Sequence, residues 1–211
     1  MSRSSRYRPL LFLVSLSLWL FSGCGLLKGF RLVNQGRLVA APGMTFDEVR
    51  KASSLELPKE YRMDKEATVT NSTPLAFDFE LSGTGLRFRS CYFYSMWTKD
   101  PDPGLNYIQI QLDKNISWDT AKKELVEIQA RLKENGFSPV VLPADGKNAE
   151  QRLQDALAGP APGYSIGFGW TKNGISFVYS ARRSPYAING EDPNEGSHYE
   201  VELEMRKAKQ D

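Results

Sequence analysis

Residues 164–181 read YSIGFGWTKNGISFVYSA, a pattern typical of a β-hairpin. Apolar and aromatic runs flank Asn173-Gly174, a pair that readily adopts the positive φ angles of a tight turn between antiparallel strands. We therefore expect strands over 164–171 and 174–181. A third strand is expected over 198–205, where apolar residues alternate with polar ones.

Two helices are expected before this hairpin. Ser117 is a suitable N-cap for an amphipathic helix, and Asn135-Gly136 marks its end. Asn148 and Gln151 form the capping-box pattern of a second helix, which Gly159-Pro160 terminates. The second part of the chain is therefore predicted to contain helices followed by three strands.

The first part of the chain repeats this order. Thr45 and Glu48 form a capping box at the start of a short helix. Three strand-like runs follow over 75–81, 86–97 and 107–112, with period-2 alternation and turn residues between them.

The order of these elements predicts an α+β fold of two small modules, 44–113 and 114–211. Each module is expected to pack its helix or helices on one face of a three-stranded antiparallel sheet. The sheets are either separate or joined into one continuous sheet, and the sequence leaves both arrangements open.

The chain begins with a basic segment that contains Arg3, Arg6 and Arg8 and no acid. An apolar run over residues 10–21 follows, which is shorter than the roughly 20 residues needed to span a bilayer. This layout predicts a secretory signal peptide over residues 1–23. A short membrane anchor that is never cleaved is the alternative.

Phe21-Ser22-Gly23-Cys24 resembles the lipobox of bacterial lipoproteins, in which two small residues precede a cysteine. The resemblance implies cleavage before Cys24, attachment of lipid to this residue and anchoring to a membrane, for which more than one acyl chain is needed. Gly25 in place of aspartate implies the outer membrane, with the protein facing the periplasm. Residues 24–43 are then a lipid-anchored tether, or a first strand over 30–39.

Charge argues against nucleic acid as a partner. The leader contains three of the 27 Lys and Arg residues and none of the 25 acids, so the mature part has a net charge near −1. Binding to phosphate backbones needs clustered positive charge.

Few residues are available for catalysis, and we expect no catalytic residue, metal site or cofactor. His198 is the single histidine, and Cys91 is the one cysteine left after lipidation. Cys91 is expected to be buried. His198 shares a strand face with Glu200, Glu202 and Glu204, which we expect to be solvated. A hydrolase that uses Asp78, Glu80 and His198 remains an alternative.

An aromatic run, CYFYSMW over residues 91–97, is the most suggestive patch for binding. Alternation places Tyr92, Tyr94 and Met96 on one strand face, with Phe93 and Trp97 on the other. One face can belong to the core, and the other would then be an exposed interface. The candidate protein-binding residues are Tyr92, Tyr94, Met96 and Trp97.

Gly43-Met44-Thr45, followed by Val49 in a short helix, resembles the start of the module found in SmpA/OmlA-like lipoproteins of outer-membrane barrel assembly. This resemblance implies a small helix-and-sheet domain with a binding role. We therefore expect a membrane-anchored envelope lipoprotein that acts as a non-catalytic module binding another envelope protein. The alternatives are a periplasmic inhibitor or immunity-type lipoprotein, and a cell-envelope hydrolase.

Overall fold

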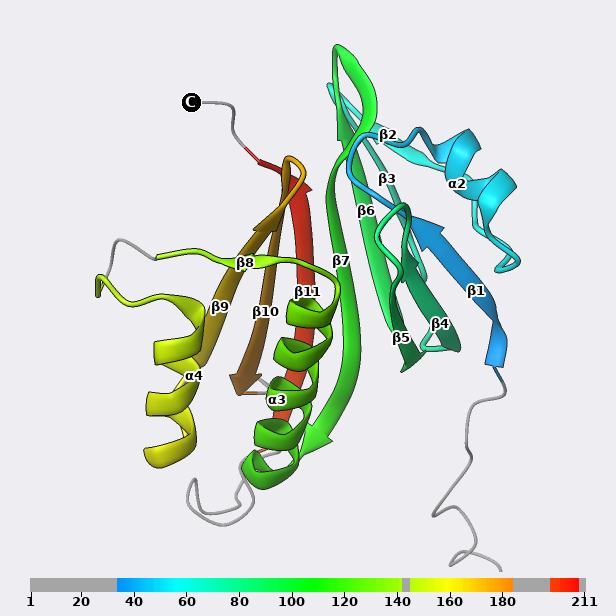
Figure 1. Ribbon diagram of the computed structural model, residues 1–211. Helices are drawn as coiled ribbons and strands as arrows, with labels where there is room; N and C mark the ends of the chain where they lie inside the picture. Colours follow the sequence, from blue (N-terminus) through cyan, green and yellow to red (C-terminus); the bar gives the residue numbers. More distant parts are fainter. Residues whose placement is uncertain (1–33, 142–144, 184–197, 209–211) are drawn as a thin grey trace, which may run out of the picture. The chain divides into compact units, whose positions relative to one another are not determined.

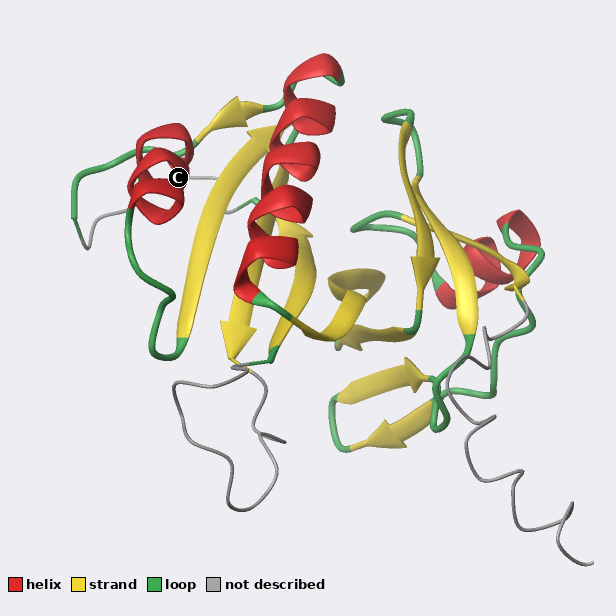
Figure 2. Cartoon of the chain, turned by 90° about the horizontal axis from the view of Figure 1, so that it is seen from below, coloured by secondary structure: helices red, strands yellow, loops and turns green. Residues whose placement is uncertain are grey.

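Strands dominate the computed structural model, which describes residues 34–141, 145–183 and 198–208 (Figures 1 and 2). The strands in these ranges are β1 (Asn34–Ala40), β2 (Tyr61–Met63), β3 (Glu66–Thr70), β4 (Ala76–Leu81), β5 (Leu86–Cys91), β6 (Phe93–Lys99), β7 (Asp102–Ile116), β8 (Ser138–Pro139), β9 (Ser165–Lys172), β10 (Ile175–Arg183) and β11 (Tyr199–Lys207). The helices are α2 (Phe46–Ala52), α3 (Trp118–Glu134) and α4 (Ala149–Ala158). The leader 1–23, Cys24 and the first part of the predicted tether lie outside the described residues.

The strands form one large and one small sheet. The large sheet has eight strands in the order β2-β3-β6-β7-β11-β10-β9-β8, and the small sheet has three in the order β1-β4-β5. All described pairings are antiparallel except that of β1 with β4, which is parallel. Figure 1 shows the central position of β7, between β6 and β11.

The predicted fold class, two modules that each pack helices on a three-stranded sheet, is wrong. Strand β7 pairs with β6 on one side and with β11 on the other, so strands from both halves of the sequence share the large sheet. The run over 86–97, predicted as one strand, is divided in two. The break falls at Tyr92, so β5 joins the small sheet and β6 the large one. Just before the break, Ser90 has a φ of 60° and lies at an irregularity in the pairing of β5 with β4.

The local signals in the sequence are confirmed. Thr45 and Glu48 form a capping box at α2, Ser117 caps α3, and Asn148 forms a capping box at α4. Asn173 and Gly174 have φ angles of 49° and 75°, as a primed turn requires, and they join β9 to β10. Each of these features depends on neighbours in sequence, which is why the sequence could reveal it.

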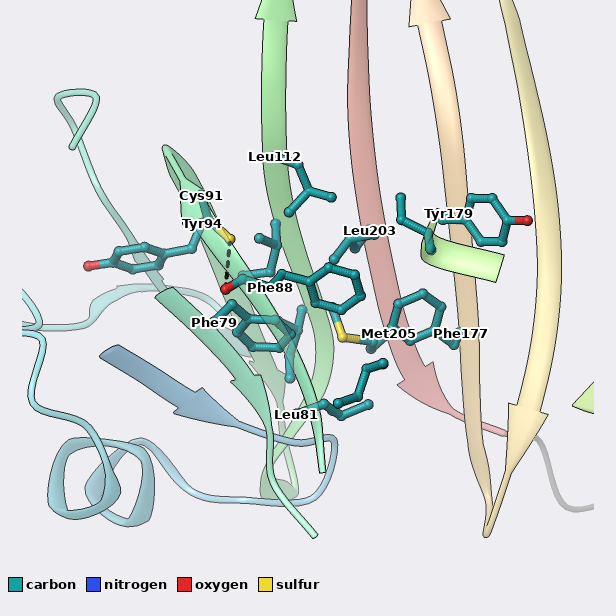
Figure 3. Packing of buried hydrophobic residues seen from close by; sticks show 14 of the residues in the cluster. Phe79, Leu81, Phe88, Cys91, Tyr94, Leu112, Phe177, Tyr179, Leu203 and Met205 are labelled. Atoms are coloured by element: carbon teal, nitrogen blue, oxygen red, sulfur yellow. Dashed lines mark hydrogen bonds between the residues drawn. The ribbon is translucent and has the colours of Figure 1, made fainter. Parts of the chain in front are cut away.

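Helix α3 and the small sheet pack on one face of the large sheet, here called the inner face. Trp118 of α3 lies against Tyr199 of β11, with ring centroids 5.2 Å apart. Phe88 of β5 stacks on Phe177 of β10 at 6.3 Å, as Figure 3 shows. These contacts place a continuous apolar core between the large sheet and its covering layer.

The segment before α2 is attached directly to β7. Gly43 N–H donates to the Leu105 carbonyl, and Leu105 N–H donates to the Met44 carbonyl, both at 2.7 Å. Gly104 permits this approach, because a Cβ atom there would lie 2.6 Å from the Gly43 oxygen. Gly43-Met44-Thr45 therefore docks the first helix on the longest strand. None of the described helices is long and apolar enough to cross a membrane.

Candidate binding surface on the open face of the large sheet

The face of the large sheet opposite the inner face, here called the open face, carries a row of aromatic and polar side chains. Five residues lie directly opposite one another on consecutive strands, from β2 through β3, β6 and β7 to β11. We call them the aromatic row: Tyr61, Thr68, Trp97, Tyr107 and Arg206. Directly paired residues point to the same side of a sheet, so these side chains form one continuous strip.

The middle of the aromatic row is tightly stacked. The ring centroids of Trp97 and Tyr107 are 4.5 Å apart, and the Arg206 guanidinium lies 4.7 Å from the Tyr107 centroid. The guanidinium is also hydrogen-bonded to Glu204 at 3.1 Å. At the other end of the row, Tyr61 is 66% exposed. The row thus combines a fixed aromatic centre with an accessible edge.

The electrostatic environment keeps this strip neutral at its centre. Burial raises the pKa of Tyr107 to about 12, and the negative charge of Glu204 adds to the shift. The phenol therefore stays protonated at physiological pH and can donate a hydrogen bond. Because Glu204 balances the charge of Arg206, the strip offers aromatic surface and directed polar groups without an excess of positive charge.

A buried ionic cluster occupies the adjoining part of the open face. The Glu202 carboxylate is 3% exposed and accepts hydrogen bonds from Arg182 at 2.8 Å and Gln111 at 2.6 Å. Arg182 also binds Glu200 at 3.1 Å. Burial alone would lower the pKa of Arg182, but its bond to Glu200 and the charges of both glutamates raise the pKa above its usual value. The cluster is therefore a fixed, charged part of the sheet.

The predicted solvated face around His198 is thus wrong in part. His198 is half-buried and Glu204 is partly accessible, but Glu200 and Glu202 are 6% and 3% exposed. The reason is that Arg182 and the neighbouring glutamine amides lie against these carboxylates, and sequence alternation alone does not reveal such cross-strand partners.

The four candidate binding residues lie in different environments. Trp97 lies in the aromatic row, and Tyr92 is half-buried between β5 and β6, where its N–H donates to the Gln111 carbonyl. Tyr94 and Met96 are 1% and 0% exposed and belong to the inner face. We therefore leave Tyr94 and Met96 out of the candidate surface. Cys91, expected to be buried, is fully so.

Sequence reasoning missed Tyr61, Tyr107 and Arg206. Tyr107 could have been found, because Ile108 and Ile110 are core residues and alternation then places Tyr107 on the other face. Tyr61 lies in a three-residue strand that no sequence pattern marks. The place of Arg206 beside Tyr107 depends on the register of β11 against β7, which is a long-range property.

The acids considered for catalysis are engaged in structural interactions. Glu80 forms ion pairs with Arg37 at 3.2 Å and Arg87 at 3.0 Å. Asp78 accepts hydrogen bonds from the Asn34 amide at 3.0 Å and from the Ser90 N–H at 3.4 Å. Within the described ranges, no group of three or more His, Cys, Asp or Glu residues could hold a metal ion.

No protein-family model, curated protein or solved structure matches this chain. The candidate site therefore depends on the geometry of the chain's own residues.

Proposed function

We propose that this chain is a lipid-anchored lipoprotein of the outer membrane, facing the periplasm, and that it acts as a non-catalytic module that binds another envelope protein. The lipobox-like sequence at Cys24 supports the anchor, and the aromatic row supports the binding role. In this proposal the partner covers Trp97, Tyr107 and Arg206 on the open face of the large sheet.

The composition of the row is the observation that carries the proposal. Trp, Tyr and Arg are the residues that most often dominate the energy of protein interfaces. Trp97 and Tyr107 hold each other in position, so binding would restrict little additional side-chain motion. The polar side chains of Thr68, Gln109 and Glu204 adjoin the aromatic surface and suit the polar rim of an interface.

The alternatives have less support. An inhibitor or immunity-type lipoprotein could use the same surface, and the identity of the partner would distinguish it from an assembly factor. A hydrolase would need accessible acids, whereas Glu80 pairs with two arginines and Asp78 accepts two hydrogen bonds.

Crosslinking in intact cells tests the binding surface. A benzophenone amino acid in place of Tyr61 is expected to capture one dominant envelope protein. The same substitution at Tyr164, which is 88% exposed and outside the row, is the matched control. Equal capture at both positions, or capture at Tyr164 alone, would show that the row is not the interface.

Affinity for the captured protein then tests the central residue. Trp97→Ala is expected to weaken binding about 30-fold, the effect of losing a hot-spot side chain of roughly 2 kcal/mol. Tyr164→Ala should leave the affinity unchanged. An unaltered dissociation constant for Trp97→Ala would remove this residue from the interface.

The anchor is tested separately. Cells labelled with an alkyne analogue of palmitate should attach the label to the natural chain and not to Cys24→Ala, which should also leave the membrane fraction. Retention of the label by Cys24→Ala would show that lipid is not attached at this residue.

A further inference from the structure

A cleft of about 540 Å³ lies beside Tyr94, between the segment that follows α2 and the segment that joins β3 to β4. Leu55, Leu57 and Pro58 form part of one wall, and Asn71 and Leu75 form part of the other. The volume falls within the range of clefts that bind small molecules.

The Tyr94 hydroxyl is the unusual group in this cleft. Tyr94 is 1% exposed, and its ring packs edge-on against Phe77 with centroids 5.4 Å apart. Figure 3 shows its oxygen pointing away from the apolar cluster, and Tyr94 is one of the residues that line the cleft. No group in the described part of the chain forms a hydrogen bond with this hydroxyl. The hydroxyl oxygen opens into the cleft, where water or a ligand can accept its hydrogen bond.

Asn71 fixes the shape of the cleft. Its amide nitrogen donates to the carbonyls of Thr73 at 2.9 Å and Tyr92 at 3.1 Å, and its oxygen accepts from the Tyr94 N–H at 2.7 Å. The Asn71 side chain is therefore occupied in holding the wall. The Tyr94 hydroxyl remains as a donor on the cleft wall that can bind a ligand.

We propose that this cleft binds a small neutral molecule with an aliphatic body and an acceptor oxygen, to which the Tyr94 hydroxyl donates a hydrogen bond. Apolar side chains on both walls match the body of such a molecule. Polar side chains complete the lining, and they include Gln35, Ser54, Ser72 and Thr73. Glu56 is the one charged residue among those described along the cleft, and it is exposed, so a charged ligand would find no buried counter-ion.

The protonation state of Tyr94 is consistent with this role. Burial raises the pKa of its phenol to about 12, so the group keeps its proton and can donate throughout the physiological range. Tyr94 lies on the inner face and Trp97 on the open face, so this site is separate from the proposed protein-binding surface and can be tested independently.

The test uses the full-length protein in lipid nanodiscs, with ¹³C at the ζ position of tyrosine. The signal absent from Tyr94→Phe identifies Tyr94. Cyclohexanone is the neutral probe, and cyclohexanecarboxylate and cyclohexylammonium are its charged analogues. We expect cyclohexanone to shift the Tyr94 signal saturably and to bind more tightly than either charged analogue.

Three variants complete the test, and their binding is followed through the NMR signals of cyclohexanone itself, because Tyr94→Phe lacks the tyrosine signal. Loss of the hydroxyl in Tyr94→Phe should weaken cyclohexanone binding about fivefold, as expected for one hydrogen bond of roughly 1 kcal/mol. Tyr164→Phe removes an exposed hydroxyl outside both the cleft and the aromatic row and should have no effect. Thr73→Trp, at the exposed rim, should block the cleft without disturbing the core. The proposal is overturned if cyclohexanone gives no saturable shift, if Thr73→Trp leaves its binding intact, or if Tyr94→Phe binds it equally well.

Discussion

The two faces of strand β11 differ in chemistry, one being apolar and the other charged. Tyr199, Val201, Leu203 and Met205 point to the inner face, and each is at most 1% exposed. Glu200, Glu202, Glu204 and Arg206 alternate with them on the open face and form ion pairs with one another or with Arg182. The same strand therefore supplies the apolar core on one side and a polar, aromatic-edged surface on the other.

This difference shows that a polar residue can be as buried as a core residue and yet contribute less to the stability of the fold. Leu203 is buried by apolar packing, whereas Glu202 is buried by its own hydrogen-bond partners. Burial of an apolar side chain stabilises the fold directly. The hydrogen bonds and ion pairs of a buried carboxylate must first offset the free energy of its lost hydration, so its net contribution to stability is smaller.

The largest expected effect is on the inner face, at Phe177. This ring lies against Phe88 of the small sheet and against Phe137, which follows α3. Phe177→Ala should lower the free energy of unfolding by about 3–5 kcal/mol, because it removes a buried ring and leaves a cavity. Urea denaturation would measure the change.

Val178 is the matched control, because it is the next residue of β10 and points to the open face. Val178→Ala should cost much less than Phe177→Ala. If the two variants lost similar amounts of unfolding free energy, the open face would be packed as tightly as the core, and the two faces would not differ in packing.

A smaller loss is expected from the ionic cluster. Glu202→Ala leaves Gln111 and Arg182 without their shared acceptor, and we expect a loss of about 1–3 kcal/mol in unfolding free energy. The larger penalties of fully buried pairs do not apply, because the Arg182 side chain is 45% exposed and can reach water.

Glu202→Gln keeps an acceptor oxygen and should lose less than Glu202→Ala. Glu204→Ala, at the accessible end of the same strand face, should lose least of the three. If Glu202→Ala were as stable as the natural chain in thermal unfolding, the cluster would contribute nothing to the fold.

The contrast within β11 also marks what the sequence could predict. Alternation identified the apolar face of this strand, and capping boxes and the Asn173-Gly174 turn identified helix starts and the hairpin, because each is a local pattern. The parallel pairing of β1 with β4, and the division of the 86–97 run at Tyr92 between two sheets, arise from contacts between distant segments. The predicted fold class failed for this reason.

In the candidate site, too, local sequence patterns could be predicted and contacts between strands could not. Trp97 was identified as a binding candidate from its aromatic run, but its partners come from other strands: Tyr107 from the next strand, β7, and Arg206 from β11, far along the chain. Their alignment depends on strand register, which a single sequence does not specify here. Tyr94 shows the converse, because its run marks it for binding while its packing assigns it to the inner face.

Met96 and Trp97 are neighbours on β6 with opposite orientations, Met96 toward the inner face and Trp97 toward the open face. Trp97→Ala should reduce the free energy of unfolding by about 1 kcal/mol, the size of its contact with the Tyr107 ring. Met96→Ala, in the core, should cost about 2–5 kcal/mol. Thermal unfolding of both variants would measure the two losses. A larger loss for Trp97→Ala than for Met96→Ala would mean that Trp97 is itself a core residue.

The smallest effect is expected at Arg206, at the end of the aromatic row. Its side chain is 61% exposed, so Arg206→Ala should cost only about 0.5–1 kcal/mol, in the range of an exposed cation–π contact. Arg206→Lys separates the two contacts of this residue. A lysine can keep the charge beside Glu204 but cannot place a planar guanidinium over the Tyr107 ring.

Urea denaturation at low and high salt distinguishes the two contacts of Arg206. If stacking dominates, Arg206→Lys should be little better than Arg206→Ala, and the difference from the natural chain should persist in high salt. If the ion pair dominates, lysine should restore the stability at low salt and lose it as salt screens the charges. We expect the first result, because the guanidinium lies directly over a partly buried ring whereas its ion pair with Glu204 is exposed to solvent.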